Sequence, residues 1–114
     1  MMPSRFVATK DILFALYKAT GKTRITITKL QDTLAYIFRH LAENKLLDNY
    51  NIMFNLTPIS IERIAAYNQN ELRYDHHEDA FYLRTPERLD ALTEQHKLPP
   101  DIQTAITEFI STNI

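Results

Sequence analysis

Four consecutive residues, His76 to Asp79, carry imidazole and carboxylate groups, which are the ligand types of zinc sites. They lie between two short apolar-alternating runs, so we expect them to form the turn of a β-hairpin. Adjacent residues of a turn point in different directions. A zinc site needs three or four converging ligands, so His40 or His96 would have to supply a ligand from another part of the chain. We therefore interpret this segment as a solvated turn and expect no metal site.

Other side chains give no pattern of an active site. Ser60 and Ser111 stand in no nucleophile motif, and the acidic residues between positions 71 and 79 cluster because they flank the predicted turn. The chain has no cysteine, and its single glycine, Gly21, excludes the glycine-rich loops that cradle phosphates. We expect a protein that is not an enzyme, with no catalytic residues and no cofactor.

Composition favours one soluble domain, 1–114. The chain has 114 residues, of which 45% are hydrophobic and 24% charged. Its net charge is -1, but eight basic and three acidic residues up to position 45 give +5, and the remainder carries -6. This asymmetry of charge suits a protein that places one face near phosphate groups, and it equally suits head-to-tail self-association. The amino terminus resembles neither a signal peptide nor a membrane span, so we expect a cytoplasmic protein without membrane contact.

Periodicity predicts helices around one hairpin, which we place at about residues 71–85. Leu72 and Tyr74 share one face of its first arm, and Phe81 and Leu83 share one face of the second. The remaining predicted elements are a helix over residues 10–20 with Gly21 as its cap, a short strand over 23–27, a helix from the Thr28 to Gln31 capping box to about Asn44, a helix starting at residues 57–60 whose apolar side is Ile61, Ile64, Ala65 and Tyr67, and two helices within about 86–114.

This order of elements predicts a mainly helical α+β fold: a winged helix-turn-helix with one small antiparallel sheet and additional C-terminal helices. Three short segments carry a closer resemblance. Residues 29–36, KLQDTLAY, are similar to a KLQKLLY-type second helix, residues 54–60 to a GPYS-type start of the third helix, and residues 81–86 to a late Tyr-x-Leu-Thr pattern. In these segments the chain resembles SocA-like antitoxin and YwgA-like domains. The resemblance implies regulation or toxin neutralisation through contacts with protein or DNA, with no catalytic residues to transfer.

In a winged helix the third helix usually enters the major groove, while the wing contacts the flanking backbone. Asn and Gln suit adenine and Arg suits guanine, so we expect this helix to read bases. The candidate DNA-binding residues are Lys29, Ser60, Arg63, Asn68, Gln69, Asn70 and Arg73. Lys18, Lys22 and Arg24 would add phosphate contacts if they converge with Lys29. The alternative is an ordinary solvated surface, because the third helix holds one basic residue and a long segment precedes it.

The last predicted helix carries an apolar stripe of Ile102, Ile106, Phe109 and Ile110. We expect this stripe to form a homodimer interface across a two-fold axis. The alternative is that it packs back on the first helix.

Two hypotheses for function follow. The first is a non-enzymatic regulatory protein that binds double-stranded DNA, with the third helix as reader. The alternative is a protein–protein interaction module, such as an antitoxin-like adaptor or inhibitor, on the same scaffold without DNA. Convergence of the amino-terminal bases beside the third helix would favour the first hypothesis. Burial of that helix by the segment 45–56 would favour the second.

Overall fold

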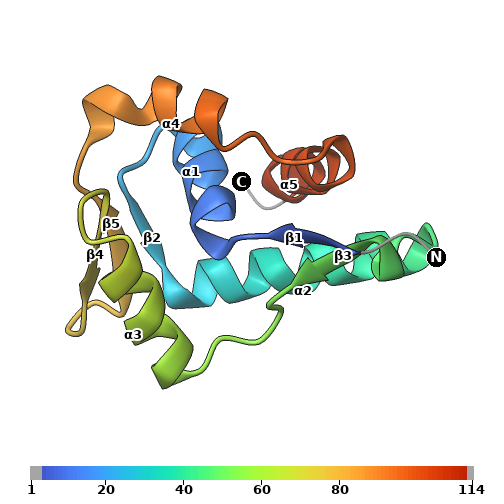
Figure 1. Cartoon of the computed structure of the whole chain (residues 1–114), viewed down its shortest axis with the longest axis horizontal. Helices are drawn as coiled ribbons and strands as arrows, with labels where there is room; N and C mark the ends of the chain where they lie inside the picture. The colour runs from blue at the N-terminus through green and yellow to red at the C-terminus, as the bar shows by residue number, and fades with distance from the viewer. Residues whose placement is uncertain (1–3, 113–114) are drawn as a thin grey trace.

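The computed structural model describes residues 4–112. This range forms five α-helices and five strands (Figure 1). In chain order the elements are β1 (Arg5–Val7), α1 (Thr9–Thr20), β2 (Arg24–Thr26), α2 (Ile27–Glu43), a 3-10 turn (Leu47–Asn49), β3 (Tyr50–Ile52), α3 (Pro58–Tyr67), β4 (Leu72–Asp75), β5 (Ala80–Leu83), a second 3-10 turn (Pro86–Arg88), α4 (Leu89–Gln95) and α5 (Pro100–Thr112). The predicted class, mainly helical α+β with a small antiparallel sheet and C-terminal helices, is confirmed.

The antiparallel sheet has the strand order β2-β5-β4. The β4–β5 hairpin follows the predicted alternation, since Leu72 lies opposite Leu83 and Tyr74 opposite Phe81. Strand β2 pairs with the other edge of β5 through Ile25 and Phe81. The sheet therefore stands at one end of the molecule, with α3 leading into it (Figure 1).

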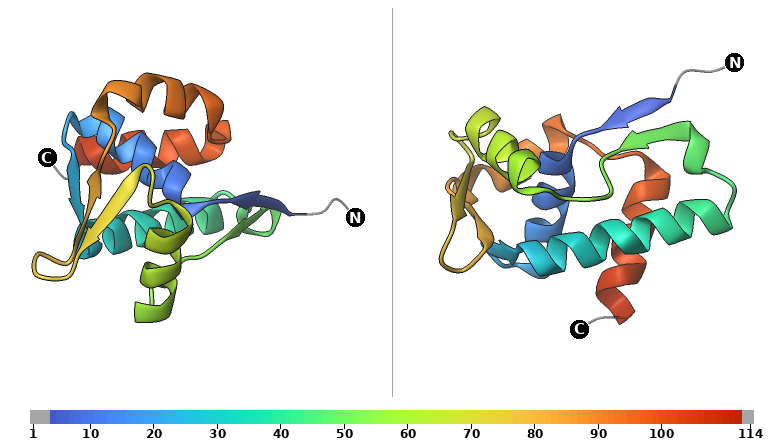
Figure 2. Two further views of the ribbon diagram at one scale, coloured as in Figure 1. Left: turned by 60° about the vertical axis from the view of Figure 1, so that its left-hand side comes forward. Right: turned by 90° about the horizontal axis from the view of Figure 1, so that it is seen from below.

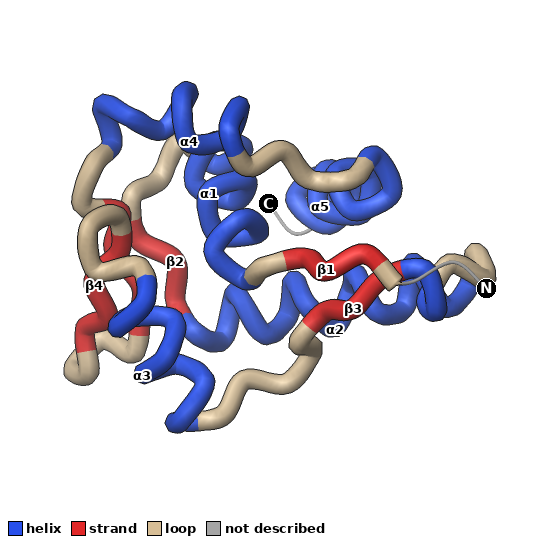
Figure 3. Tube along the Cα trace, in the orientation of Figure 1, coloured by secondary structure: helices blue, strands red, loops and turns tan. Residues whose placement is uncertain are grey.

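A second sheet was not predicted. Strands β1 and β3 pair in parallel, with Arg5 opposite Tyr50 and Val7 opposite Ile52 (Figure 3). Each strand has three residues, which is too short for a periodic signal, and their pairing joins segments about 45 positions apart. This pairing brings the segment before α1 next to the segment that leads to α3.

Helix α1 occupies the middle of the core. Ile12, Leu13, Phe14, Leu16 and Tyr17 are fully buried, and β2, α4 and α5 pack against the helix. The Tyr17 hydroxyl donates a buried hydrogen bond of 2.8 Å to the Phe81 carbonyl, which ties α1 to the central strand of the sheet. Burial raises the pKa of Tyr17 well above its usual value near 10, so the hydroxyl remains a donor. As predicted, Gly21 caps the helix with positive φ, and its N–H donates to the Tyr17 carbonyl.

Helix α2 begins earlier than its sequence pattern predicts. Thr26, at the end of β2, is the cap, and its hydroxyl accepts a hydrogen bond from the Lys29 N–H at 3.1 Å. Gln31 consequently takes no part in the predicted capping box. Its side chain donates to the Phe54 carbonyl at 2.6 Å and accepts from the Leu56 N–H at 2.9 Å. These two bonds fix the segment between β3 and α3 against α2.

Helix α3 starts as the sequence predicts. Thr57 and Ser60 form a reciprocal capping box, and Pro58 occupies the first turn. Ile61 and Ile64 are buried, and the helix packs on β4. Tyr67 was predicted on this apolar side, and that prediction is wrong: its side chain is 84% exposed. Tyr67 lies with the exposed Ile59 on the outward face of the helix.

Replacing Tyr17 with Phe tests the bond between α1 and β5. The variant leaves a buried carbonyl without its donor, so we expect the free energy of unfolding to fall by about 1–2 kcal/mol in urea titrations. The matched control is Tyr67→Phe, which removes a hydroxyl from an exposed ring and should leave stability unchanged. Equal stability of the two variants would contradict the role given to the Tyr17 bond.

Candidate functional site

The outward face of α3 presents one row of side chains four residues apart: Ile59, Arg63 and Tyr67. Four-residue spacing places successive side chains on the same face of a helix. Ile59 is 67% exposed and Tyr67 is 84% exposed, and Arg63 between them is also exposed. No ion pair or side-chain hydrogen bond holds Arg63 within the part of the chain that the structure describes. We call these three residues the α3 row.

Two predicted DNA-contacting residues are engaged in the helix itself. The Ser60 hydroxyl accepts a hydrogen bond from the Thr57 N–H at 2.7 Å and donates to the Thr57 carbonyl at 2.9 Å. The Asn68 side-chain amide donates to the Ile64 carbonyl at 2.8 Å. Gln69 and Asn70, in contrast, lie exposed in the turn between α3 and β4. The polar groups of Ser60 and Asn68 are therefore engaged in hydrogen bonds at the two ends of α3.

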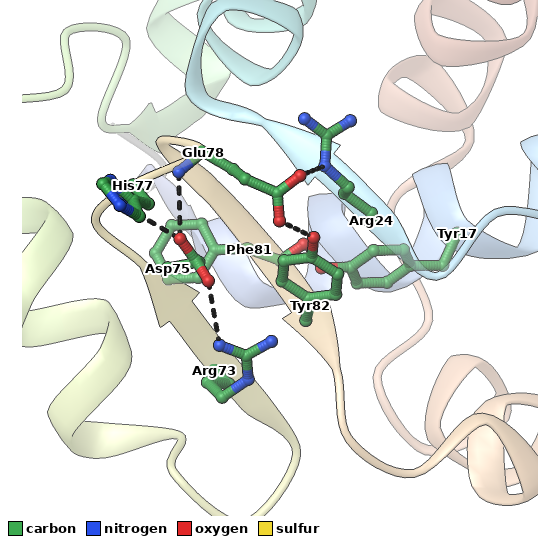
Figure 4. A network of polar contacts seen from close by, with 8 residues as sticks. All are labelled: Tyr17, Arg24, Arg73, Asp75, His77, Glu78, Phe81 and Tyr82. Atoms are coloured by element: carbon green, nitrogen blue, oxygen red, sulfur yellow. Dashed lines mark hydrogen bonds and ion pairs between the residues drawn. The ribbon is translucent and has the colours of Figure 1, made fainter.

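The cations of the hairpin are paired within the sheet (Figure 4). Arg73 lies 3.3 Å from the Asp75 carboxylate, and its guanidinium is 4.5 Å from the centre of the Tyr82 ring. Arg24 lies 3.0 Å from Glu78, which also accepts a hydrogen bond from the Tyr82 hydroxyl. The predicted contact of Arg73 with a nucleic-acid backbone would have to compete with these interactions.

Hydrogen bonds from the backbone close the hairpin turn. The Asp75 carboxylate accepts from the N–H groups of Glu78 and His77, both at 2.9 Å. The bond from Glu78 above all, with further help from Arg73 and His77, holds the pKa of Asp75 below its usual value. The His76 ring packs edge-on against Tyr74, with centroids 4.7 Å apart. Within residues 4–112, no three His, Asp or Glu side chains gather in a way that could hold a metal ion.

Three of the four amino-terminal bases that were expected to converge beside α3 make contacts elsewhere. Lys18 lies 3.6 Å from Asp90 of α4, and the Lys29 ammonium stands 5.0 Å from the centre of the Phe109 ring of α5. Arg24 is held at the hairpin, as described above. The residue that does meet α3 is Lys10, in the first turn of α1. Sequence reasoning did not select it because its proximity to Arg63 depends on the unpredicted β1–β3 pairing.

A cavity of about 390 Å³ lies between the β1–α1 junction and α3. Its lining includes Phe6, Lys10, Met53, Arg63, Ile64 and Tyr67. Phe6 is 71% exposed, so two large aromatic side chains from distant parts of the sequence border one open hollow. We call this hollow the β1–α3 cavity. The segment 45–56 contributes Met53 to it but leaves the α3 row uncovered.

The apolar stripe of the last helix is already covered within the chain. Ile102 is fully buried, Ile106 is 3% exposed and Phe109 is 5% exposed, while Ile110 is half-buried. Helix α5 crosses α2 and also packs on α1 (Figure 2, right). The expectation that these residues form an exposed dimer interface is therefore corrected in favour of its alternative, packing on the rest of the chain. Dimerisation through another surface stays a prediction.

No protein-family model, curated protein or solved structure matches this chain. The resemblance to SocA-like and YwgA-like domains accordingly stays a prediction. The function of the chain has to be argued from its own surface.

Replacing Ile106 with Ala distinguishes a core residue from a dimer contact. We expect a loss of about 2–5 kcal/mol in the free energy of unfolding that is the same at low and high protein concentration. The control is Ile59→Ala, which truncates an exposed isoleucine and should be nearly neutral. A loss that grows with protein concentration would instead place Ile106 in an intersubunit interface.

Proposed function

We propose that this chain is a non-enzymatic protein–protein interaction module whose contact surface is the outward face of α3. The observation that carries the proposal is the α3 row itself. Apolar side chains as exposed as those of Ile59 and Tyr67 occur together at interaction sites more often than on bare surface. Tyr and Arg are also the residue types that dominate binding energy at protein interfaces.

The folded core does not require these exposed side chains. Helix α3 already buries Ile61 and Ile64 against β4, so the α3 row adds nothing to that packing. Leaving Ile59 and Tyr67 in water forgoes the stabilisation that their burial would provide, about 1.5–3 kcal/mol for a large apolar side chain. A partner that covers the row would recover part of this free energy.

Duplex DNA is the second candidate. Its support is that Arg63 in the middle of α3 and Gln69 and Asn70 in the turn after it are exposed, where they would face base edges in a major-groove complex. Against it, tight DNA binding rests on several phosphate contacts from bases near the reading helix. Here Lys10 lies beside α3, but Lys18, Arg24 and Lys29 lie on other surfaces, so the geometry supports a protein partner better.

No helix within residues 4–112 is long and apolar enough to cross a membrane. The sequence lacks cysteine, which is compatible with the cytoplasmic location that we propose for the module. Self-association is compatible with the proposal if a second copy occupies the same face.

A selection of randomised 12-residue peptides displayed on phage against the purified protein tests the proposal. We expect the enriched peptides to bind the double variant Ile59→Ser/Tyr67→Ser at least about 30-fold more weakly, the effect of losing about 2 kcal/mol at a binding hot spot. The control is Phe38→Ser, which removes a 45%-exposed aromatic ring from α2. Circular dichroism would confirm that each variant is folded.

Peptides that bind the double variant and the wild-type protein equally well would contradict the proposal. They would show that the α3 row is not the preferred contact surface.

A further inference from the structure

The β1–α3 cavity has the size and lining of a specific binding site. Its volume of about 390 Å³ falls within the range of roughly 300–1,000 Å³ that is usual for ligand pockets. The side chains of Met53 and Ile64 give it apolar contact area, and Phe6 and Tyr67 extend that area outward. One large apolar side chain of a partner can be accommodated there and lose part of its contact with water.

The cavity is also positively charged. Lys10 and Arg63 line it, and no acidic side chain of residues 4–112 does, although the chain as a whole carries a net charge of -1. Asp11, whose carboxylate interacts with Lys10, lines a different cavity and lies 3.5 Å from His96. The charge of Glu62, beside Arg63, contributes to raising the pKa of Tyr74 in the hairpin. The two cations are thus the charges best placed to meet an anionic group of an occupant.

Three uncharged polar side chains of the α1 and α3 segments line the cavity, those of Thr9, Ser60 and Asn68, and two of them are already engaged. The Ser60 hydroxyl is engaged with Thr57, and the Asn68 amide is engaged with the Ile64 carbonyl. Recognition of base edges requires free donors and acceptors, whereas an apolar side chain needs only contact area. The two positive charges would attract a phosphate as well as a carboxylate, so the preference for a carboxylate-bearing peptide over a nucleotide rests on this scarcity of polar groups.

We propose that the β1–α3 cavity binds a peptide segment of a partner protein in which an aromatic or large aliphatic side chain neighbours an Asp or Glu. The apolar side chain enters the hollow between Phe6 and Tyr67, and the carboxylate pairs with Lys10 and Arg63. This inference rests on the proposed function and adds the chemistry of the partner to it. The acidic residue supplies specificity, because an uncharged segment would leave the two cations partly desolvated without a partner.

The test uses the peptides enriched by the phage selection, with the starting library as reference. We expect the enriched sequences to place Asp or Glu next to Phe, Tyr or Leu. Synthetic versions should bind the double variant Lys10→Gln/Arg63→Gln at least about tenfold more weakly in fluorescence polarisation, and Phe6→Ser should weaken them as well. The matched control is Lys22→Gln/Arg88→Gln, which neutralises one exposed lysine and one exposed arginine outside the cavity.

The possible failures are distinguishable. Peptides that require Ile59 and Tyr67 but show neither acidic enrichment nor dependence on Lys10 and Arg63 would overturn this inference and leave the proposed function standing. Peptides that depend on none of these residues would overturn both. A concentration-dependent dimer in sedimentation experiments that dissociates in Phe6→Ser would make a second copy the occupant, and this too would overturn the inference.

Discussion

The burial of α1 is the constraint on which the rest of the structure depends. Five of its side chains are fully buried, so β2, α4 and α5 must arrange themselves around one helix. The hydrogen bond from Tyr17 to the Phe81 carbonyl orients this packing, because a Tyr17 hydroxyl buried without a partner would cost free energy of folding. It fixes the central strand of the sheet relative to α1. The position of β5 in turn sets the position of β4, the strand on which α3 packs.

The candidate site is a consequence of the same arrangement. Ile61 and Ile64 direct the inner face of α3 onto β4, and helical geometry then places Ile59, Arg63 and Tyr67 together on the outer face. Gln31 holds the preceding segment against α2 through two hydrogen bonds. The β1–β3 pairing completes the site, since it brings Phe6 and the start of α1 beside α3. Three separate stretches of sequence thus meet at one hollow.

Sequence reasoning succeeded where one segment carries its own signal. The hairpin was readable from the alternation of Leu72, Tyr74, Phe81 and Leu83, and the start of α3 from the cap and proline before it. The start of α2 was misplaced because Thr26 and Thr28 are both plausible caps, and the pairing of β2 with β5 decides between them.

The site was harder to predict than the fold. An amphipathic stripe shows that a helix buries one face but not what covers it, so the stripe of α5 was read as a dimer contact when α1 and α2 cover it. Tyr67 was assigned to the core because aromatic residues on a helix usually lie there. Phe6 and Lys10 carry no local pattern. Their role depends on a long-range pairing between two three-residue strands, which is invisible in local periodicity.

The central claim is that the outward face of α3 serves a protein partner and not duplex DNA. Fluorescence polarisation of a pooled random duplex tests it most directly, at low and moderate salt and with Arg63→Ala beside the wild-type protein. The account predicts binding weaker than about 10 μM at moderate salt, no tighter than ordinary nonspecific association, and unchanged by the substitution. Submicromolar binding that weakens steeply with salt and is lost in Arg63→Ala would contradict it.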